Sequence, residues 1–243
     1  MNEYLNFFSK IFEFFGSIGK SFYKTVIYDN RYEYILEGLF HTIIIALFAV
    51  IIGIVIGILV SLIRNNYEIN GKNKLLYKIA NLYVNIIRGT PVILQLMIIY
   101  YVIFKSVNIN IVIVGIIAFG INSGAYVSEI IRAGINSVDK GQFEAGYGLG
   151  LSYGKVMRYI ILPQAFKNIL PAMGNEFITL VKETAVGAYI GIVELTKASD
   201  IIASRTYDYF FPLIIIAIIY FAITLSLTKL FSRIERRLNN VRS

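Results

Sequence analysis

EAGYGLGLSYGKVMRYIILP, residues 144–163, is a glycine-rich and partly basic stretch that separates two long apolar regions of the chain. It is too polar to cross a bilayer, because a spanning helix needs about 20 predominantly apolar residues. The regions on both sides are apolar enough to do so. The sequence therefore predicts a hairpin, residues 140–163, that lies outside the membrane between spanning helices.

The rest of the chain has the composition of an integral membrane protein. Hydrophobic residues make up 57% of the 243 residues and charged residues 16%, and the mean hydropathy is +0.67. A soluble domain with this surface would aggregate. The second predicted span needs Arg88 to snorkel to the interface, and the fourth carries Glu176, Lys182 and Glu183 in its middle. The apolar runs predict five spans, at 38–63, 79–104, 106–128, 167–193 and 209–228.

Lysine and arginine are distributed unevenly between the loops. They gather after the first, third and fifth predicted spans, whereas only Lys105, Lys197 and Arg205 lie between the other spans. The positive-inside rule then places the hairpin and the C-terminus in the cytoplasm and the N-terminus outside. The net charge of +8 follows this topology, so nucleic acid is not predicted as a partner.

Residues 1–34 differ from the spans. Apolar residues recur there at helical spacing with charged residues between them, which predicts an external amphipathic helix in contact with membrane lipid. A signal peptide is the rival interpretation, but Glu3, Glu13 and the lack of an uninterrupted apolar core disfavour it. No linker divides the remainder, so residues 35–243 form one membrane domain.

The sequence gives no support for chemistry carried by this chain. Cysteine is absent and His41 is the single histidine, so no metal site is predicted. Gly150 to Lys155 approaches a phosphate-binding loop, but the glycine spacing is one residue short and Val156 replaces the serine or threonine. No H-E-x-x-H motif or nucleophile–base constellation occurs. The chain is therefore predicted to be neither an ATPase nor another membrane enzyme.

The hairpin carries a specific motif. The cytoplasmic signature of ABC importer permeases reads E-A-A-x3-G-x9-I-x-L-P, and Gly146 here replaces its second alanine. The residues that match its register are Glu144, Ala145, Gly150, Ile160, Leu162 and Pro163. Further motifs that look like this family are Arg88-Gly89-Thr90-Pro91 with Gln95, Ala125-Tyr126 with Glu129, Arg132 and Gly134, Asn175-Glu176-Phe177, and Lys182-Glu183-Thr184. From about residue 37 onward, the chain resembles the polar amino acid permeases of type I ABC importers.

This resemblance implies an all-α integral membrane protein in the cytoplasmic membrane of a prokaryote, with five transmembrane helices, the N-terminal amphipathic helix and a cytoplasmic coupling helix. It implies two ABC ATP-binding subunits that hold ATP and magnesium, an identical or homologous second permease chain, and an extracytoplasmic amino-acid-binding protein. The external segment 194–208 is polar enough to meet that binding protein. This chain itself binds no cofactor and is a non-catalytic translocation subunit.

The resemblance also implies residue roles. Coupling to the ATPase falls to Glu144, Ala145, Gly146, Gly150, Leu162 and Pro163. We expect Glu144 near a helix start, where the helix dipole favours a carboxylate, and Pro163 as a limit to continuation into the next helix. Structural or gating roles fall to Arg88, Pro91, Gln95, Glu129, Arg132, Glu176 and Lys182. Lys182 is expected to pair with Glu129 or Glu176.

Polar residues at membrane depth predict the substrate contacts. A charge at the bilayer centre costs about 2.5–3.5 kcal/mol on insertion scales, so such residues face protein or water. Asn122 and Glu183, helped by Thr184, are predicted to contact the transported amino acid, and the carboxylate favours a basic one: arginine, lysine or histidine. Three alternatives stay open: glutamine or another polar amino acid as substrate, an ion-coupled carrier, and a Glu183 that only neutralises a neighbouring cation.

Overall fold

The computed structural model describes residues 16–240, without the side chains of Asn70 and residues 238–240. Residues 1–15, which hold half of the predicted amphipathic helix, lie outside the described residues; residues 16–22 are helical. The regular structure of the described part is all helical. Its elements are η1 (Tyr23–Ile27), η2 (Tyr28–Asn30), α2 (Tyr32–Asn70), α3 (Lys74–Gly89), α4 (Val92–Ile98), η3 (Ile99–Ile103), α5 (Ile111–Asn136), α6 (Lys140–Gly148), α7 (Tyr153–Val156), η4 (Met157–Ile161), α8 (Leu162–Glu183), η5 (Thr184–Ile190), α9 (Leu195–Thr206) and α10 (Phe210–Asn240).

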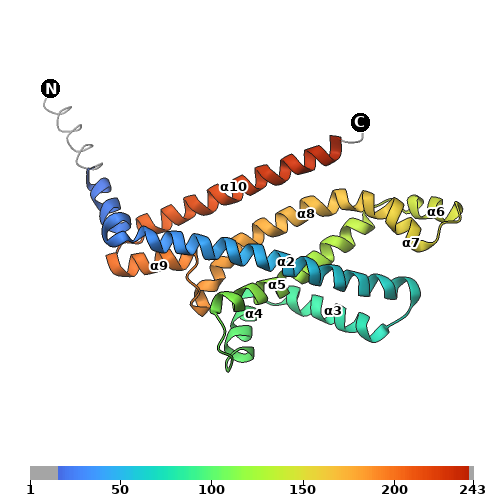
Figure 1. The fold of residues 1–243 in the computed structure, drawn as a ribbon, viewed down its shortest axis with the longest axis horizontal. Helices are drawn as coiled ribbons and strands as arrows, with labels where there is room; N and C mark the ends of the chain where they lie inside the picture. The colour runs from blue at the N-terminus through green and yellow to red at the C-terminus, as the bar shows by residue number, and fades with distance from the viewer. Residues whose placement is uncertain (1–15, 241–243) are drawn as a thin grey trace.

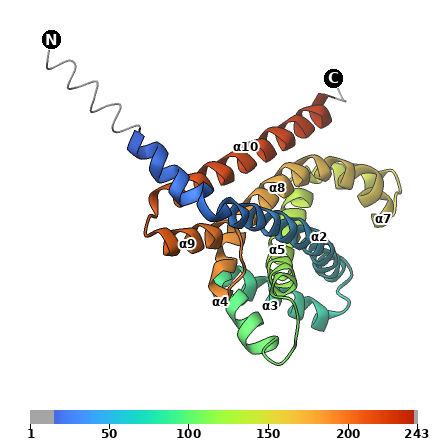
Figure 2. The same ribbon diagram turned by 60° about the vertical axis from the view of Figure 1, so that its left-hand side comes forward.

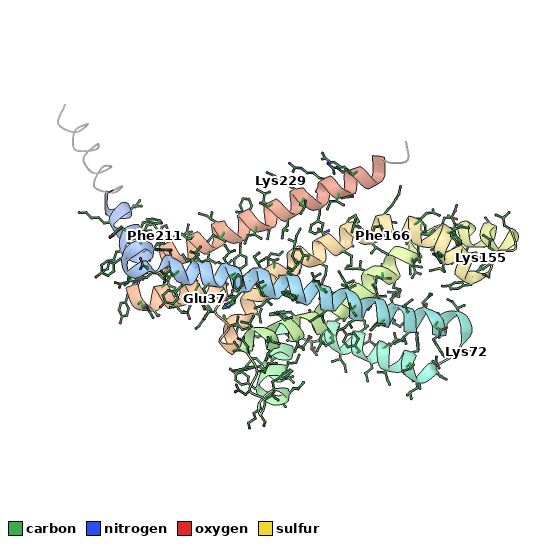
Figure 3. All side chains as sticks on the ribbon, in the orientation of Figure 1. Glu37, Lys72, Lys155, Phe166, Phe211 and Lys229 are labelled. Carbon is green, nitrogen blue, oxygen red and sulfur yellow. The ribbon has the colours of Figure 1, made fainter. Side chains whose placement is uncertain are left out.

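Four long helices, α2, α5, α8 and α10, run between the two ends of the molecule (Figure 1). The hairpin with α6 and α7 lies at one end, and the N-terminal segment lies with α9 at the other. Lys72 and Lys155 mark the hairpin end, whereas Glu37 and Phe211 mark the opposite end (Figure 3). The basic loops therefore gather at one end, as the positive-inside pattern predicts.

The α2–α5 pair forms the centre of the bundle, and glycines let the two helices approach closely. A Cβ atom built on Gly57 of α2 would lie 2.5 Å from Val127 Cγ1, and one built on Gly124 of α5 would lie 2.7 Å from Ile56 Cγ2. Each helix thus supplies glycines against branched side chains of the other. This contact fixes α5 against α2 along the polar residues described below.

The second predicted span is not one straight helix. The helix at Lys74–Gly89 and the helical segment Val92–Ile103 meet at 112°. Thr90 has φ −125° and ψ 148°, the extended conformation that a following proline imposes, and Pro91 has no N–H to continue the helix. Residues 79–87 are helical, but they do not run in the same direction as residues 92–103. The expected continuous span from 79 to 104 is therefore wrong.

Among the described residues, three helices are long and apolar enough to cross a membrane, Tyr32–Ile69, Ile111–Asn136 and Phe210–Arg237, and the bent pair makes a fourth if it counts as one span. The predicted span at 167–193 corresponds to α8, which packs against α2, α5 and α10. It begins five residues earlier than predicted, at Leu162, and changes to a tighter 3-10 helix after Glu183.

Two expectations for the hairpin are wrong. Glu144 is in the middle of α6, because the helix begins at Lys140, and Asp139 caps it by accepting a hydrogen bond from the Gly141 N–H at 2.7 Å. Pro163 does not stop the next helix. The wider turn of η4 ends directly before Pro163, where the Leu162 N–H bonds to the carbonyl of Met157, five residues back. Pro163 then lies in the first turn of α8, where the missing N–H is tolerated.

Candidate functional site

The carboxylates of Glu176 and Glu183 lie on one face of α8, since seven residues make nearly two full turns. Both are half-buried. Glu176 accepts a hydrogen bond from the Ser123 hydroxyl of α5 at 2.8 Å. Glu183 has no hydrogen bond or ion pair with any described residue, and Lys182 forms no ion pair within the same part of the chain, so neither expected Lys182 pair is found. Glu183 is thus a carboxylate without an ion-pair partner among the described residues.

Thr184 follows Glu183 but does not share its surroundings. Its side chain is completely buried, and its hydroxyl donates to the carbonyl of Val181 at 2.7 Å. This bond within the chain satisfies the hydroxyl donor. The geometry therefore places Thr184 behind Glu183 and not beside it on the half-exposed face.

Asn122 is also buried, with 4% of its surface exposed. Its amide donates to Gln95 Oε1 at 2.9 Å, and the Gln95 amide donates to the carbonyls of Ile87 at 2.7 Å and Thr90 at 3.0 Å and to the Thr90 hydroxyl at 2.8 Å. This chain of bonds joins α5 to the bend after α3. Asn122 and Glu183 make no direct contact, and only the neighbouring Ser123 reaches the α8 face.

Glu129 of α5 is surrounded by arginines. It forms ion pairs with Arg64 of α2, with Arg132 at 2.6 Å and with Arg88 at 3.5 Å. The Arg88 guanidinium also lies 5.5 Å from the Tyr126 ring centroid. The resemblance implies a structural role for the segment from Arg88 to Pro91. In the structure, Arg88 contacts α5, and Thr90 accepts hydrogen bonds from Gln95 of α4. One carboxylate thus joins the ends of three helices, which we call the Glu129 cluster (Arg64, Arg88, Glu129 and Arg132).

The coupling residues divide into an outer and an inner set. Glu144, Ala145, Leu162 and Pro163 are exposed, and near them the side chains of Tyr147, Leu149 and Tyr159 are 48%, 78% and 66% exposed. Large apolar side chains exposed together at the tip of a hairpin are typical of a protein interface.

Gly146 is the inner residue, whereas Gly150 is exposed at the turn. Gly146 is buried, and a Cβ atom there would lie 2.8 Å from Val156 Cγ2, so the departure from the alanine of the signature permits close packing of α6 on the following helix. Gly150 has φ +73°, the left-handed conformation that glycine adopts without strain, and it turns the chain between α6 and α7.

Sequence reasoning missed three participants. Arg64 and Ser123 contact Glu129 and Glu176 from 65 and 53 residues away along the chain, which no local motif shows. The third is Glu194, which is completely buried and accepts hydrogen bonds from the Thr196 and Lys197 N–H groups at 2.8 and 2.7 Å and from the Tyr220 hydroxyl at 3.0 Å. It therefore caps α9, and burial raises the pKa of its carboxyl. A polar residue directly before a helical pattern was the available signal.

The described residues contain no group of three or more histidine, cysteine or acidic side chains placed to hold a metal ion. The polar residues above lie within a helical bundle. Within the described part of the chain, they offer hydrogen-bond acceptors and a carboxylate without an ion pair, but no nucleophile paired with a base.

Comparison with known proteins agrees with this arrangement. Residues 53–240 match the family described as binding-protein-dependent transport system inner membrane component. The chain is 42% identical over 213 residues to a putative glutamine transport system permease protein of Rickettsia prowazekii (strain Madrid E), covering 87% of this chain and 95% of that one. It is 44% identical over 209 residues to the arginine transport system permease protein of Bacillus subtilis (strain 168), covering 85% and 93%.

A solved structure is similar as well. The crystal structure of an amino acid ABC transporter with histidines superposes with a TM-score of 0.78 at 46% sequence identity, covering 84% of this chain and 94% of that chain. At this identity the likeness extends to sequence as well as fold.

Proposed function

This chain belongs to the binding-protein-dependent transport system inner membrane components, as the non-catalytic permease subunit of an ABC amino acid importer, and we propose that its substrate is a basic amino acid: arginine, lysine or histidine. The family implies an ATPase and a binding protein as partners. The proposal concerns what passes through the permease and which residues meet it.

The observation that carries the proposal is the half-buried Glu183 carboxylate without a cation partner among the described residues. A charge of this kind costs free energy in a bundle unless a ligand or water meets it. A substrate guanidinium or ammonium group would supply the missing cation. The rival idea, that Glu183 neutralises a cation of its own chain, lacks such a cation within ion-pair distance.

Glu176 and Asn122 have separate parts in this proposal. Glu176 is held by Ser123 and presents its second oxygen on the same α8 face. Asn122 is engaged with Gln95, so it would contact the substrate only if that bond exchanged during transport. We therefore propose Glu183 as the principal contact and Asn122 and Thr184 as supporting residues.

The test replaces Glu183 by glutamine in the assembled importer. A hydrogen bond to a charged group contributes about 1.5–3 kcal/mol, so Glu183→Gln should raise the KM for arginine about 10- to 150-fold. Uptake and substrate-stimulated ATP hydrolysis with arginine, lysine, histidine and glutamine are the measurements. Glu235→Gln is the matched control, because it makes the same change at an exposed carboxylate of α10. Unchanged kinetics with all three basic amino acids would reject the proposal, and a loss confined to glutamine would favour the glutamine alternative.

We further propose five spans, with α8 as the fourth and the bent α3–α4 pair as the second, the N-terminus outside and the hairpin inside. Packing of α8 against α2, α5 and α10 supports this count. The half-exposed polar face of α8 also supports a second permease chain, identical or homologous, that completes the pathway for alternating access. Labelling of single cysteines introduced at Glu37 and Lys155 from either side of the membrane tests the orientation; labelling of both from the same side contradicts it.

The hairpin would transmit ATP-driven closure, because its tip exposes Glu144 beside large apolar side chains. Glu144→Lys should uncouple ATP hydrolysis from uptake without loss of membrane insertion. Glu235→Lys is the control, since Glu235 is an exposed carboxylate on α10, outside the hairpin. Unchanged uptake per ATP hydrolysed in Glu144→Lys would count against the coupling role.

A further inference from the structure

A cationic hollow lies at the end of the molecule opposite the coupling hairpin. It has a volume of about 430 Å³ and is formed where the N-terminal segment meets the end of α9. The two segments lie side by side in both ribbon views (Figures 1 and 2). The residues that line it are Tyr23, Lys24, Tyr28, Arg31, Arg205, Thr206 and Tyr207.

Arg31 is buried in this hollow and incompletely bonded. Only 8% of its surface is exposed. One terminal nitrogen donates to the Lys24 carbonyl and the other to Asp29 Oδ2 at 3.0 Å, while Nε has no hydrogen-bond partner among the described residues. A buried donor without an acceptor is rare, because it loses its bond to water. Arg31 is thus a largely buried cation of the hollow, and its two terminal nitrogens are bonded within the N-terminal segment.

The charges around the hollow favour an anion. Three of its lining residues are cationic and none is acidic. Asp29 pairs with Arg31 from outside the lining, and the nearby Asp208 accepts from the Ser21 and Thr25 hydroxyls at 3.0 and 3.4 Å and from the Phe210 N–H at 2.9 Å.

The position of these cations is itself unusual. Lysine and arginine concentrate on the cytoplasmic side of membrane proteins, yet these three lie at the opposite end from Lys72 and Lys155 (Figure 3). A cationic group kept against that bias requires another reason, and an anionic ligand provides one.

Exposed aromatic side chains indicate the level of the hollow relative to the membrane. Tyrosine is enriched where a protein crosses the level of the lipid headgroups. Among residues 22–32 and 207–210, the aromatic side chains that are at least 39% exposed are Phe22, Tyr23, Tyr28, Tyr32, Tyr207, Tyr209 and Phe210. Their grouping around the hollow places the cations at headgroup level, where the abundant anion is a phosphate.

We propose that this hollow binds the headgroup phosphate of an anionic phospholipid. Lys24, Arg31 and Arg205, which line the hollow, supply the positive charge that attracts the phosphate. The Arg205 guanidinium lies 4.9 Å from the Tyr34 ring centroid, which holds it in place near the lipid. Assignment to the outer leaflet rests on the orientation proposed above, whereas the lipid site itself does not depend on the transported substrate.

The experiment uses the full-length chain purified with its ATPase and depleted of lipid. Native mass spectrometry follows the binding of short-chain phosphatidylglycerol, short-chain phosphatidylcholine and inorganic phosphate. Each cation near an anionic lipid is worth about fivefold in affinity, so Lys24→Gln combined with Arg205→Gln should weaken phosphatidylglycerol binding about 30-fold. Both side chains are exposed, so the double variant should fold. Lys197→Gln is the matched control, because Lys197 lies on α9 outside the hollow and pairs with Asp200 at 2.8 Å.

Selective binding of phosphatidylglycerol, lost in the double variant and kept in the control, supports the site. Equal binding of phosphatidylcholine, equally tight binding of inorganic phosphate, or unchanged affinity of the double variant would overturn the proposal. Loss of stimulation by the binding protein with unchanged lipid binding would overturn it too, in favour of a protein partner.

Discussion

The Glu129 cluster and the polar face of α8 use the same kind of residue in opposite ways. Glu129 is held by three arginines from α2, α3 and α5, with only 15% of its side chain exposed. Glu183 on α8 is half-buried and has no ion-pair partner within the described residues. A carboxylate that is fully paired fixes helices in place. A carboxylate without an ion pair gives the fold no such link, which is why we propose Glu183 as a substrate contact.

The largest expected effect is the loss of the Glu129 carboxylate. Glu129→Ala leaves Arg64, whose side chain is 14% exposed, as an unpaired cation. Removal of one partner of a buried ion pair costs about 3–5 kcal/mol of folding free energy. Thermal unfolding of the purified importer should therefore shift strongly downward. Glu183→Ala is the paired measurement, and we expect it to leave the unfolding temperature nearly unchanged; equal losses in the two variants would remove the distinction between the two regions.

How far the sequence predicted these regions depends on the distance between contacting residues. Hydropathy and charge bias located the long helices and the basic end, because each is a property of consecutive residues. The signature register located the glycine of the hairpin turn, since Gly150 adopts the left-handed conformation there. The Glu129 cluster was not predictable, since Arg64 and Glu129 are 65 residues apart. The bend at Pro91 was also missed, although Thr90 and Pro91 carried the local signal for it.

The second effect concerns Asn122, which lies between the two regions. Asn122→Leu leaves the buried Gln95 without its partner, and an unsatisfied buried polar group costs about 1–3 kcal/mol. The double variant Asn122→Leu with Gln95→Leu removes both amides. It should be more stable than Asn122→Leu alone only if the Gln95 bonds to the bend after α3 contribute little to stability. A double-mutant cycle on thermal stability measures the coupling between the two amides.

Uptake kinetics of the same Asn122 variants separate structure from transport. If Asn122 serves only to hold Gln95, its effect on the KM for arginine should disappear once each variant is assayed well below its unfolding temperature. A persistent KM increase, of the size caused by Glu183→Gln, would instead join Asn122 to the substrate contacts.

The smallest effect is expected at Arg88, the outer member of the Glu129 cluster. Its side chain is 43% exposed and 3.5 Å from Glu129, so solvent screens the pair and Arg88→Gln should cost less than about 1 kcal/mol. The measurement is the unfolding temperature of Arg88→Gln and of Arg64→Gln at low and at high salt. The first variant alters an exposed member of the cluster and the second a buried one. Arg64→Gln should be the more damaging and the less sensitive to salt, because its pair is shielded from water. Equal losses of stability would mean that burial does not decide the strength of the two ion pairs.

If Arg88→Gln keeps its stability yet raises ATP hydrolysis without substrate, then the weakest contact of the cluster is the one that opens during transport. The paired carboxylate then has a gating role as well as a structural one.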